Sequence, residues 1–189
     1  MTEPSRVLAL VGSPRVGGNT DILVDEVLRG AKEVGALVEK VYLDRCMIGP
    51  CHACNACEDT GVCFQRDDMD ELLDRMKRSD VWVLATPVYW WGATAQFKQF
   101  LDRWYAPWHG AEPKEVFENR RIVVVVTLGD SSIATADPTL EMFRRALSYI
   151  GLDLVATVVA PGVYALGDAS ARTDLLQKAR AAGRTAVAE

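Results

Sequence analysis

Five short apolar runs recur along the chain, and segments with helical spacing lie between them. The clearest run, IVVVVTL at 122–128, is almost entirely β-branched and shows no polar alternation. Such a run is typical of a strand that is buried on both faces, as in a parallel sheet covered by helices. The other runs lie at 6–12, 36–43, 81–86 and 152–160. This alternation predicts an α/β fold, a doubly wound five-stranded parallel sheet with helices on both faces.

Helices are expected in the intervals between these strands. Apolar residues recur with the helical period in the segments 20–34, 93–105, 138–150 and 168–188. A further helix is expected after Asp67 and Asp68, either of which could cap its N-terminus. Gly151 is placed to end the helix expected over 138–150. Because the chain has no internal repeats or low-complexity linkers, residues 1–189 are expected to form one domain.

The composition is that of an ordinary globular chain with a mildly acidic surface. Hydrophobic residues make up 49% and charged residues 25% of the sequence, and the net charge is −5. A nucleic-acid-binding protein would present a basic face, so no nucleic-acid partner is expected. No apolar run approaches the roughly eighteen residues of a membrane span, and the first residues form no basic leader. We therefore expect a cytoplasmic protein that does not contact a membrane.

The loop between the first strand and the first helix, GSPRVGGNT at 12–20, combines glycines with short polar side chains. Its glycines allow close backbone approach, and the helix that follows supplies free N–H groups and a positive dipole end. The residues expected to hold a phosphate are Ser13, Arg15, Gly18, Asn19 and Thr20. A P-loop is excluded because Gly18 and Asn19 stand where its lysine and Ser/Thr would be. The alternative is a common strand–helix turn in which Asn19 or Thr20 caps the helix.

An aromatic loop, TPVYWWG at 86–92, follows the third strand directly. The backbone of the loop, which includes Pro87, Val88 and Gly92, could face a flat ligand, and Tyr89, Trp90 and Trp91 could stack on one. The loop after the fourth strand adds a weaker signal, Gly129 and Asp130. Ligands of doubly wound sheets bind at the carboxyl ends of the strands, so the three loops are predicted to form one site. The alternatives for the aromatic residues are a subunit interface or plain core packing.

All five cysteines fall within 18 consecutive residues, in a loop expected at 44–66. An odd number crowded into one loop is a poor disulfide framework, and in a reducing cytosol clustered thiols more often bind metal or carry out redox chemistry. The spacing C-x2-C-x2-C-x5-C would let three thiolates surround one cube-shaped iron–sulfur cluster, while a fourth thiolate reaches the cluster through a short loop. The four ligands would be Cys51, Cys54, Cys57 and Cys63. The alternative is a loop of free thiols that react or pack without metal.

Three motifs together carry a resemblance to a known family. The order GSPRVGGNT, then CHACNACEDTGVC followed by RDDM, then TPVYWWGATAQFKQFLDRW, resembles the NADPH-dependent FMN reductase superfamily, and within it the iron–sulfur flavoprotein branch. The resemblance implies a flavodoxin-like sheet with the strand order 2-1-3-4-5, bound FMN, and homodimers or homotetramers. It assigns the 12–20 loop to the FMN phosphate and the 87–92 loop to the isoalloxazine, with Gly129 and Asp130 closing the site. It also implies a [4Fe–4S] cluster on the four spaced cysteines.

The expected function is that of an FMN-dependent oxidoreductase. NAD(P)H would be the electron donor, and the acceptor a small molecule such as a quinone, a nitro-aromatic, a flavin or an oxygen species. With a cluster present, exchange with a ferredoxin-like donor would also be expected. Because the cofactor supplies the chemistry, no catalytic acid or base is predicted. The alternatives from other classes are a non-enzymatic electron carrier and a thiol-based redox sensor.

Overall fold

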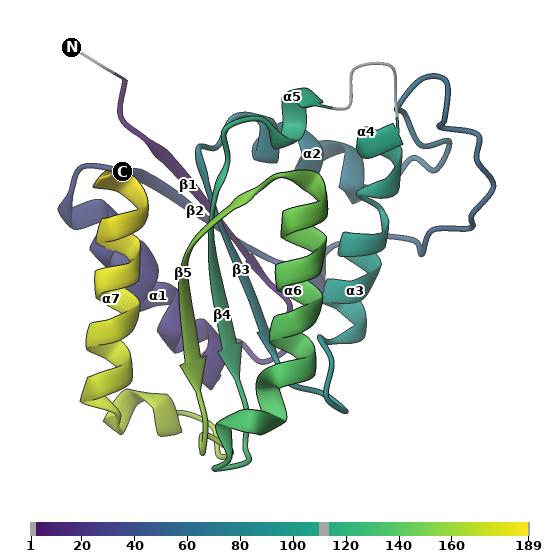
Figure 1. The fold of residues 1–189 in the computed structure, drawn as a ribbon. Helices are drawn as coiled ribbons and strands as arrows, with labels where there is room; N and C mark the ends of the chain where they lie inside the picture. The colour runs from purple at the N-terminus through teal and green to yellow at the C-terminus, as the bar shows by residue number, and fades with distance from the viewer. Residues whose placement is uncertain (1–2, 110–113, 189) are drawn as a thin grey trace.

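The structure, a computed structural model, describes residues 3–109 and 114–188. Its centre is a parallel sheet of five strands in the order β2-β1-β3-β4-β5, which confirms the predicted doubly wound sheet and its strand order (Figure 1). The strands are β1 (Arg6–Val11), β2 (Leu37–Tyr42), β3 (Val81–Pro87), β4 (Arg121–Thr127) and β5 (Asp153–Ala160). Each differs from its predicted range by a residue or so at one or both ends.

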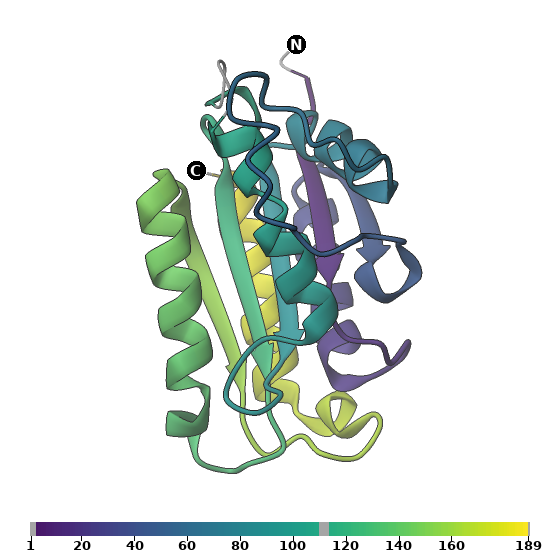
Figure 2. The same cartoon turned by 90° about the vertical axis from the view of Figure 1, so that its right-hand side faces the viewer.

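Helices cover both faces of the sheet. One face carries α1 (Asn19–Glu33) and α7 (Thr173–Ala188), and the other carries α3 (Ala95–Asp102) and α6 (Asp137–Ile150) (Figures 1 and 2). The shorter elements are η1 (Leu43–Arg45), α2 (Asp68–Lys77), α4 (Tyr105–His109), α5 (Lys114–Phe117), η2 (Ile133–Ala136) and η3 (Asp168–Ala171). Among residues 3–109 and 114–188, no helix combines the length and apolarity needed to cross a bilayer.

Alternate residues of the strands pack into two different cores. On the α1–α7 side the sheet presents small side chains such as Val7 and Ala9, and the two helices lie very close together. A Cβ added at Gly30 of α1 would stand 1.9 Å from the Arg180 carbonyl oxygen of α7, so only glycine fits there. On the opposite side, Leu8 and its neighbours pack against an aromatic cluster on α3 and α6. These two cores fix the strands whose ends form the sites described below.

The predicted helices are present. The helix after the paired aspartates begins at Asp68, and Asp67 caps it by accepting a hydrogen bond from the Met69 N–H at 3.1 Å. Two other helices are each divided into two elements. The helix expected over 93–105 ends at Asp102 and is followed by the separate α4, and the helix expected over 168–188 is divided into η3 and α7. The second break lies at Arg172, whose backbone leaves the helical region with ψ of 79°.

Candidate functional site

A pocket lies at the carboxyl ends of the strands, at the lower end of the sheet in Figure 1. Its lining includes ten residues named from the sequence: Ser13, Arg15, Gly18, Asn19, Thr20, Pro87, Val88, Tyr89, Gly129 and Asp130. It also includes Leu128, at the start of the predicted loop after the fourth strand, and three residues that sequence reasoning missed: Thr127, Val163 and Tyr164. We call this the strand-end pocket. The three predicted loops therefore do meet, and the loop after β5 joins them.

The β1–α1 loop presents a helix N-terminus to this pocket. Gly18 is the N-cap of α1 and makes no side-chain capping bond, so neither Asn19 nor Thr20 caps the helix as the alternative interpretation expected. The first N–H groups of an α-helix have no partner within the helix. The Arg15 side chain is exposed and makes no hydrogen bond with the described residues, although its backbone N–H donates to Ser13 Oγ at 3.2 Å. This end of α1 therefore offers N–H donors and a guanidinium to an anion.

Asn19 ties two walls of the pocket together. Its Nδ2 donates to the carbonyl oxygens of Val163, at 3.1 Å, and Ala165, at 2.8 Å. Its Oδ1 accepts from the Ala169 N–H at 2.9 Å. Because the side chain is fully engaged with the loop after β5, Asn19 can offer the pocket its backbone N–H rather than its amide group.

Buried threonines connect the floor of the pocket to the strands. Thr20 Oγ1 lies 2.7 Å from Thr127 Oγ1, and both side chains are buried. On the neighbouring loop, Thr94 Oγ1 donates to the Gly12 carbonyl at 2.7 Å, and the Thr94 N–H donates to Thr86 Oγ1 at 3.1 Å. The only sequence signal for Thr127 was a polar residue ending an otherwise apolar strand.

The wall opposite α1 is built on the loops after β4 and β5. The Tyr164 ring lies against Gly129, where an added Cβ would stand 2.8 Å from the ring carbon Cδ2. Asp130 folds its own loop, because its carboxylate accepts from the Ser132 N–H at 2.9 Å and from the Thr135 hydroxyl at 2.7 Å. The Tyr164 side chain is 82% exposed and stands at the mouth of the pocket.

Trp90, Trp91 and Gly92 lie outside the lining of this pocket. The residues 89–92 form a tight turn in which Tyr89 and Gly92 exchange backbone hydrogen bonds at 2.9 and 3.0 Å. Both tryptophans at its tip have positive φ, 49° and 61°, which is the backbone of a type I′ turn. The turn directs them outward, so that Trp90 is 92% and Trp91 55% exposed. Two bulky residues in the left-handed region are a source of local strain.

The four spaced cysteines line a second, smaller pocket, which we call the cysteine pocket. Ala53 and Asn55, which separate the first three cysteines, have φ of 52° and 59° and turn the backbone sharply between them. Cys51 and Cys54 are exposed, Cys57 is buried, and Cys63 is half-buried. Burial raises the pKa of the Cys57 thiol, and the three other cysteines add to the effect. Cys46 points elsewhere, with its thiol 3.5 Å from the Tyr42 carbonyl oxygen.

The four sulfurs are not gathered as they would be around one ion. Among the described residues, no three His, Cys, Asp or Glu side chains approach closely enough to hold a single metal ion. A [4Fe–4S] cube makes a different demand, because each of its irons takes one thiolate and the four ligands surround a larger body. All four cysteines line one pocket, so each is placed to supply one of these thiolates.

A buried ion pair holds the base of the cysteine loop, residues 46–67. Arg103 at the end of α3 is 2% exposed and donates to both carboxylate oxygens of Asp67, at 2.5 and 3.2 Å, and to the Gly49 carbonyl at 2.9 Å. Burial alone would raise the pKa of Asp67, but the bonds from Arg103, Gly49 and Met69 together lower it below the usual 3.8. The Nε of Arg103 has no hydrogen-bond partner within the described part of the chain. Arg103 also lines the cysteine pocket, so a buried positive charge borders it.

Comparison with known proteins places this geometry in a family. Residues 5–171 match the family described as NADPH-dependent FMN reductase. An iron–sulfur flavoprotein of Methanocaldococcus jannaschii is 42% identical over 98 residues, which cover 52% of this chain and 51% of that protein. A putative NAD(P)H-dependent FMN-containing oxidoreductase of Bacillus subtilis is 24% identical over 160 residues, covering 83% of this chain and 85% of the relative.

A solved structure has the same fold. The NAD(P)H:quinone oxidoreductase from Methanothermobacter marburgensis superposes with a TM-score of 0.73 at 22% identity, covering 95% of this chain and 94% of that one. The chain spans about half the length of several iron–sulfur flavoproteins that it matches, 51% and 44% in two cases. The half that aligns with them is 98 residues long in both.

Proposed function

This chain belongs to the NADPH-dependent FMN reductase family, and we propose that it binds FMN in the strand-end pocket and passes electrons from NAD(P)H to a small acceptor. The observation that carries the proposal is the meeting of the α1 N-terminus, the free Arg15 guanidinium and an apolar wall in one pocket. The first two suit a phosphate, and the third suits a flat ring.

The residues of the pocket fit FMN in chemistry and in placement. Bound FMN would supply the two-electron and one-electron chemistry that no side chain of this pocket can perform. The uncapped N–H groups of α1 and the Arg15 guanidinium would hold its phosphate. Val88, Leu128 and Val163 offer apolar surface to the ring, and Gly129 lets it approach the backbone closely. The chain's own part is therefore to bind, orient and exclude water.

We further propose a [4Fe–4S] cluster in the cysteine pocket, held by Cys51, Cys54, Cys57 and Cys63. The support is the shared pocket, the two left-handed residues that curl the loop, and the buried Arg103 beside it. A positive charge offsets the negative charge that four thiolates bring to a cluster. Exchange with a ferredoxin-like donor and assembly into homodimers or homotetramers belong to the same proposal.

The first experiment is one visible absorption spectrum of the anaerobically purified protein, with iron and sulfide assayed on the same sample. We expect a flavin spectrum with a brown shoulder, and about four irons and four sulfides per chain. A flavin spectrum with negligible iron would remove the cluster and leave an FMN reductase with free thiols. A colourless protein that refuses added FMN would contradict the whole proposal.

Steady-state oxidation of NADH and NADPH then tests the activity. Each nucleotide is offered with a quinone, with a nitro-aromatic compound and with free FMN as acceptor. Turnover with a purified small acceptor supports the reductase. A protein that binds FMN but oxidises neither nucleotide without a partner reductase would instead be an electron carrier.

A further inference from the structure

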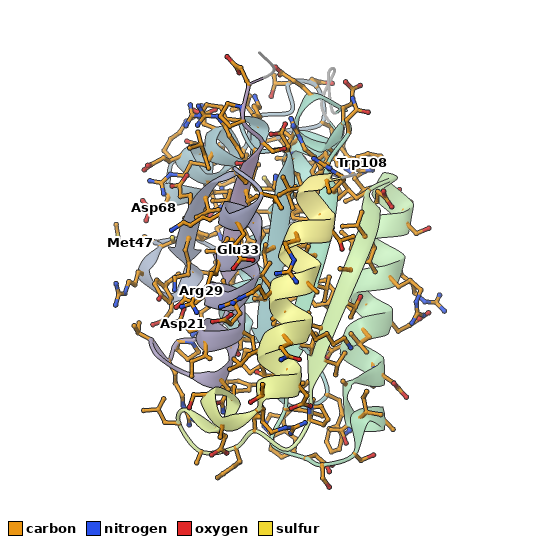
Figure 3. All side chains as sticks on the ribbon, turned by 90° about the vertical axis from the view of Figure 1, so that its left-hand side faces the viewer. Asp21, Arg29, Glu33, Met47, Asp68 and Trp108 are labelled. Atoms are coloured by element: carbon orange, nitrogen blue, oxygen red, sulfur yellow. The ribbon has the colours of Figure 1, made fainter. Side chains whose placement is uncertain are left out.

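A buried carboxylate lies directly behind the loop that is placed to hold the phosphate. Asp21, in the first turn of α1, is 3% exposed. Its Oδ2 accepts a hydrogen bond from the Gly17 N–H at 2.7 Å, and the Tyr42 hydroxyl lies 2.9 Å from both of its oxygens. Gly17 has φ of 71°, so this bond fixes a loop residue in a conformation that favours glycine. Figure 3 shows Asp21 at the lower end of α1, with Arg29 and Glu33 further along the helix.

Lys40 from β2 neutralises this carboxylate. Its Nζ lies 2.7 Å from Asp21 Oδ1 and 2.6 Å from Asp25 Oδ1, and its side chain is 20% exposed. Burial would raise the pKa of Asp21, but the bonds from Lys40, Gly17 and Tyr42 lower it below 3.8. Burial would lower the pKa of Lys40, yet its bonds to Asp21 and Asp25 raise it well above 10.5. Both groups are therefore charged at neutral pH.

Asp21 places a negative charge at the helix end that faces the expected phosphate, and Lys40 offsets that charge. A carboxylate in the first turn of a helix is favourable when that end is empty, because it complements the helix dipole. When the same end binds a phosphate with nearly two negative charges, the carboxylate repels it. In the described residues Arg15 is the single cation lining the pocket, and it makes no contact with Asp21 that would offset this charge.

We propose that Asp21 and Lys40 act as a charge-compensated pair that positions the phosphate loop for FMN. Asp21 is the positioning residue, because it holds the Gly17 N–H and with it the course of the loop. Lys40 offsets the negative charge of Asp21, so that Asp21 does not repel the phosphate. The inference rests on the proposed function, since it concerns the flavin phosphate, and it adds two residues that do not line the pocket.

The test compares FMN with riboflavin, which lacks the phosphate but has the same ring. Dissociation constants for both are measured by quenching of flavin fluorescence on apoprotein. Lys40→Met should weaken FMN binding by about tenfold and leave riboflavin within about twofold. A merely structural role for Lys40 would weaken both ligands alike. Lys32→Met makes the same change of charge on an exposed residue near the other end of α1, and should leave both constants unchanged.

The second variant, Asp21→Asn, removes the negative charge of Asp21 and keeps the size and shape of its side chain. Asp21→Asn can still accept from the Gly17 N–H, so in the Lys40→Met background it should restore most of the lost FMN affinity. On its own it should bind FMN at least as tightly as the parent, which keeps the test available if Lys40→Met fails to fold. An unchanged FMN-to-riboflavin ratio in Lys40→Met, or weaker FMN binding in Asp21→Asn, would overturn the inference while the parent still binds FMN. Failure of the parent to bind FMN would overturn the proposed function as well.

Discussion

The strand-end pocket and the cysteine pocket are both built from loops, but they are held in place differently. The strand-end loops are short and bonded directly to strand ends: the Val88 N–H donates to the Thr127 carbonyl at 2.8 Å, and the Leu128 N–H to the Ala160 carbonyl at 3.0 Å. The cysteine loop bulges away from the sheet at the upper right of Figure 1 and is fastened at its base. There Asp67 and Arg103 form the central contact, and the Met47 N–H donates to Asp68 at 2.7 Å. Figure 3 shows Met47 and Asp68 close together at one edge of the molecule.

This difference has a consequence for how each site fails. A pocket formed by backbone bonds to parallel strands persists as long as the sheet does, since the fold itself brings the strand ends together. A long loop whose base depends on one buried ion pair loses its shape when either partner is removed. We therefore expect the two sites to respond separately to substitution.

The largest effect is expected at Arg103. Arg103→Met leaves the half-buried Asp67 without its charged partner, which should lower the free energy of unfolding by up to about 3–5 kcal/mol. Urea denaturation measures the loss, and labelling of the cysteines by a thiol reagent reports the loosened loop. FMN affinity of the folded variant should change little. If the affinity for FMN falls as sharply as the labelling of the cysteines rises, the two sites are not independent.

The control for that variant is an exposed pair in the same region. Arg66→Met breaks the contact of Arg66 with Asp70, whose atoms lie 3.5 Å apart and whose side chains are 68% and 44% exposed. Exposed ion pairs contribute little, so unfolding should change by less than about 1 kcal/mol. An equal loss in both variants would mean that the burial of Arg103 is not what matters.

A substitution on the pocket floor tests the other side of the comparison. Thr20→Val leaves Thr127 Oγ1 without its buried partner, at a cost of about 1–3 kcal/mol. FMN should bind more weakly, whereas the iron content of the purified protein should stay at the parent value. The matched control is Thr185→Val, since Thr185 is exposed on α7 and its loss should fall within about 0.5 kcal/mol. Loss of iron in Thr20→Val would contradict the separation.

The same contrast explains what the sequence could predict. The parallel sheet and the meeting of the loops followed from apolar runs and from Gly12, Pro87 and Gly129 at their ends, because parallel topology leaves few alternatives. The strand order was implied by the family resemblance of the three motifs. Thr127 and Tyr164 were missed because their roles depend on which strands become neighbours. Asn19 was found as a pocket residue but not as a tether, since its partners lie 144 to 150 residues away.

The tryptophan turn was the least predictable element. A Trp-Trp pair carries no signal for a type I′ turn, which normally takes Asn-Gly. Replacing Trp90 by Asn and Trp91 by Gly should therefore relieve backbone strain and raise the free energy of unfolding by about 1–2 kcal/mol. Thermal unfolding of the double variant measures the gain. Trp90→Phe is the control, because it keeps an aromatic residue at the strained φ and should show no such gain. A double variant less stable than the parent would mean that the tryptophans are stabilised by contacts of their own.

The smallest expected effect is the pH dependence of the loop base. The pKa of Asp67 in the folded protein lies below its ordinary 3.8, so the ion pair stabilises fully above that value and its contribution is lost as pH falls through the folded pKa. Between pH 7 and 4 the unfolding free energy should therefore barely change on this account, and the loss should appear only below pH 4. Asp67→Asn, although less stable throughout, should show a shallower decline in this acid range than the parent. Asp70→Asn is the control and should keep the parent's slope, because its partner Arg66 is exposed and an exposed ion pair contributes little to stability. Asp21, Asp130 and Asp174 also carry lowered pKa values, so part of the acid sensitivity should survive in Asp67→Asn.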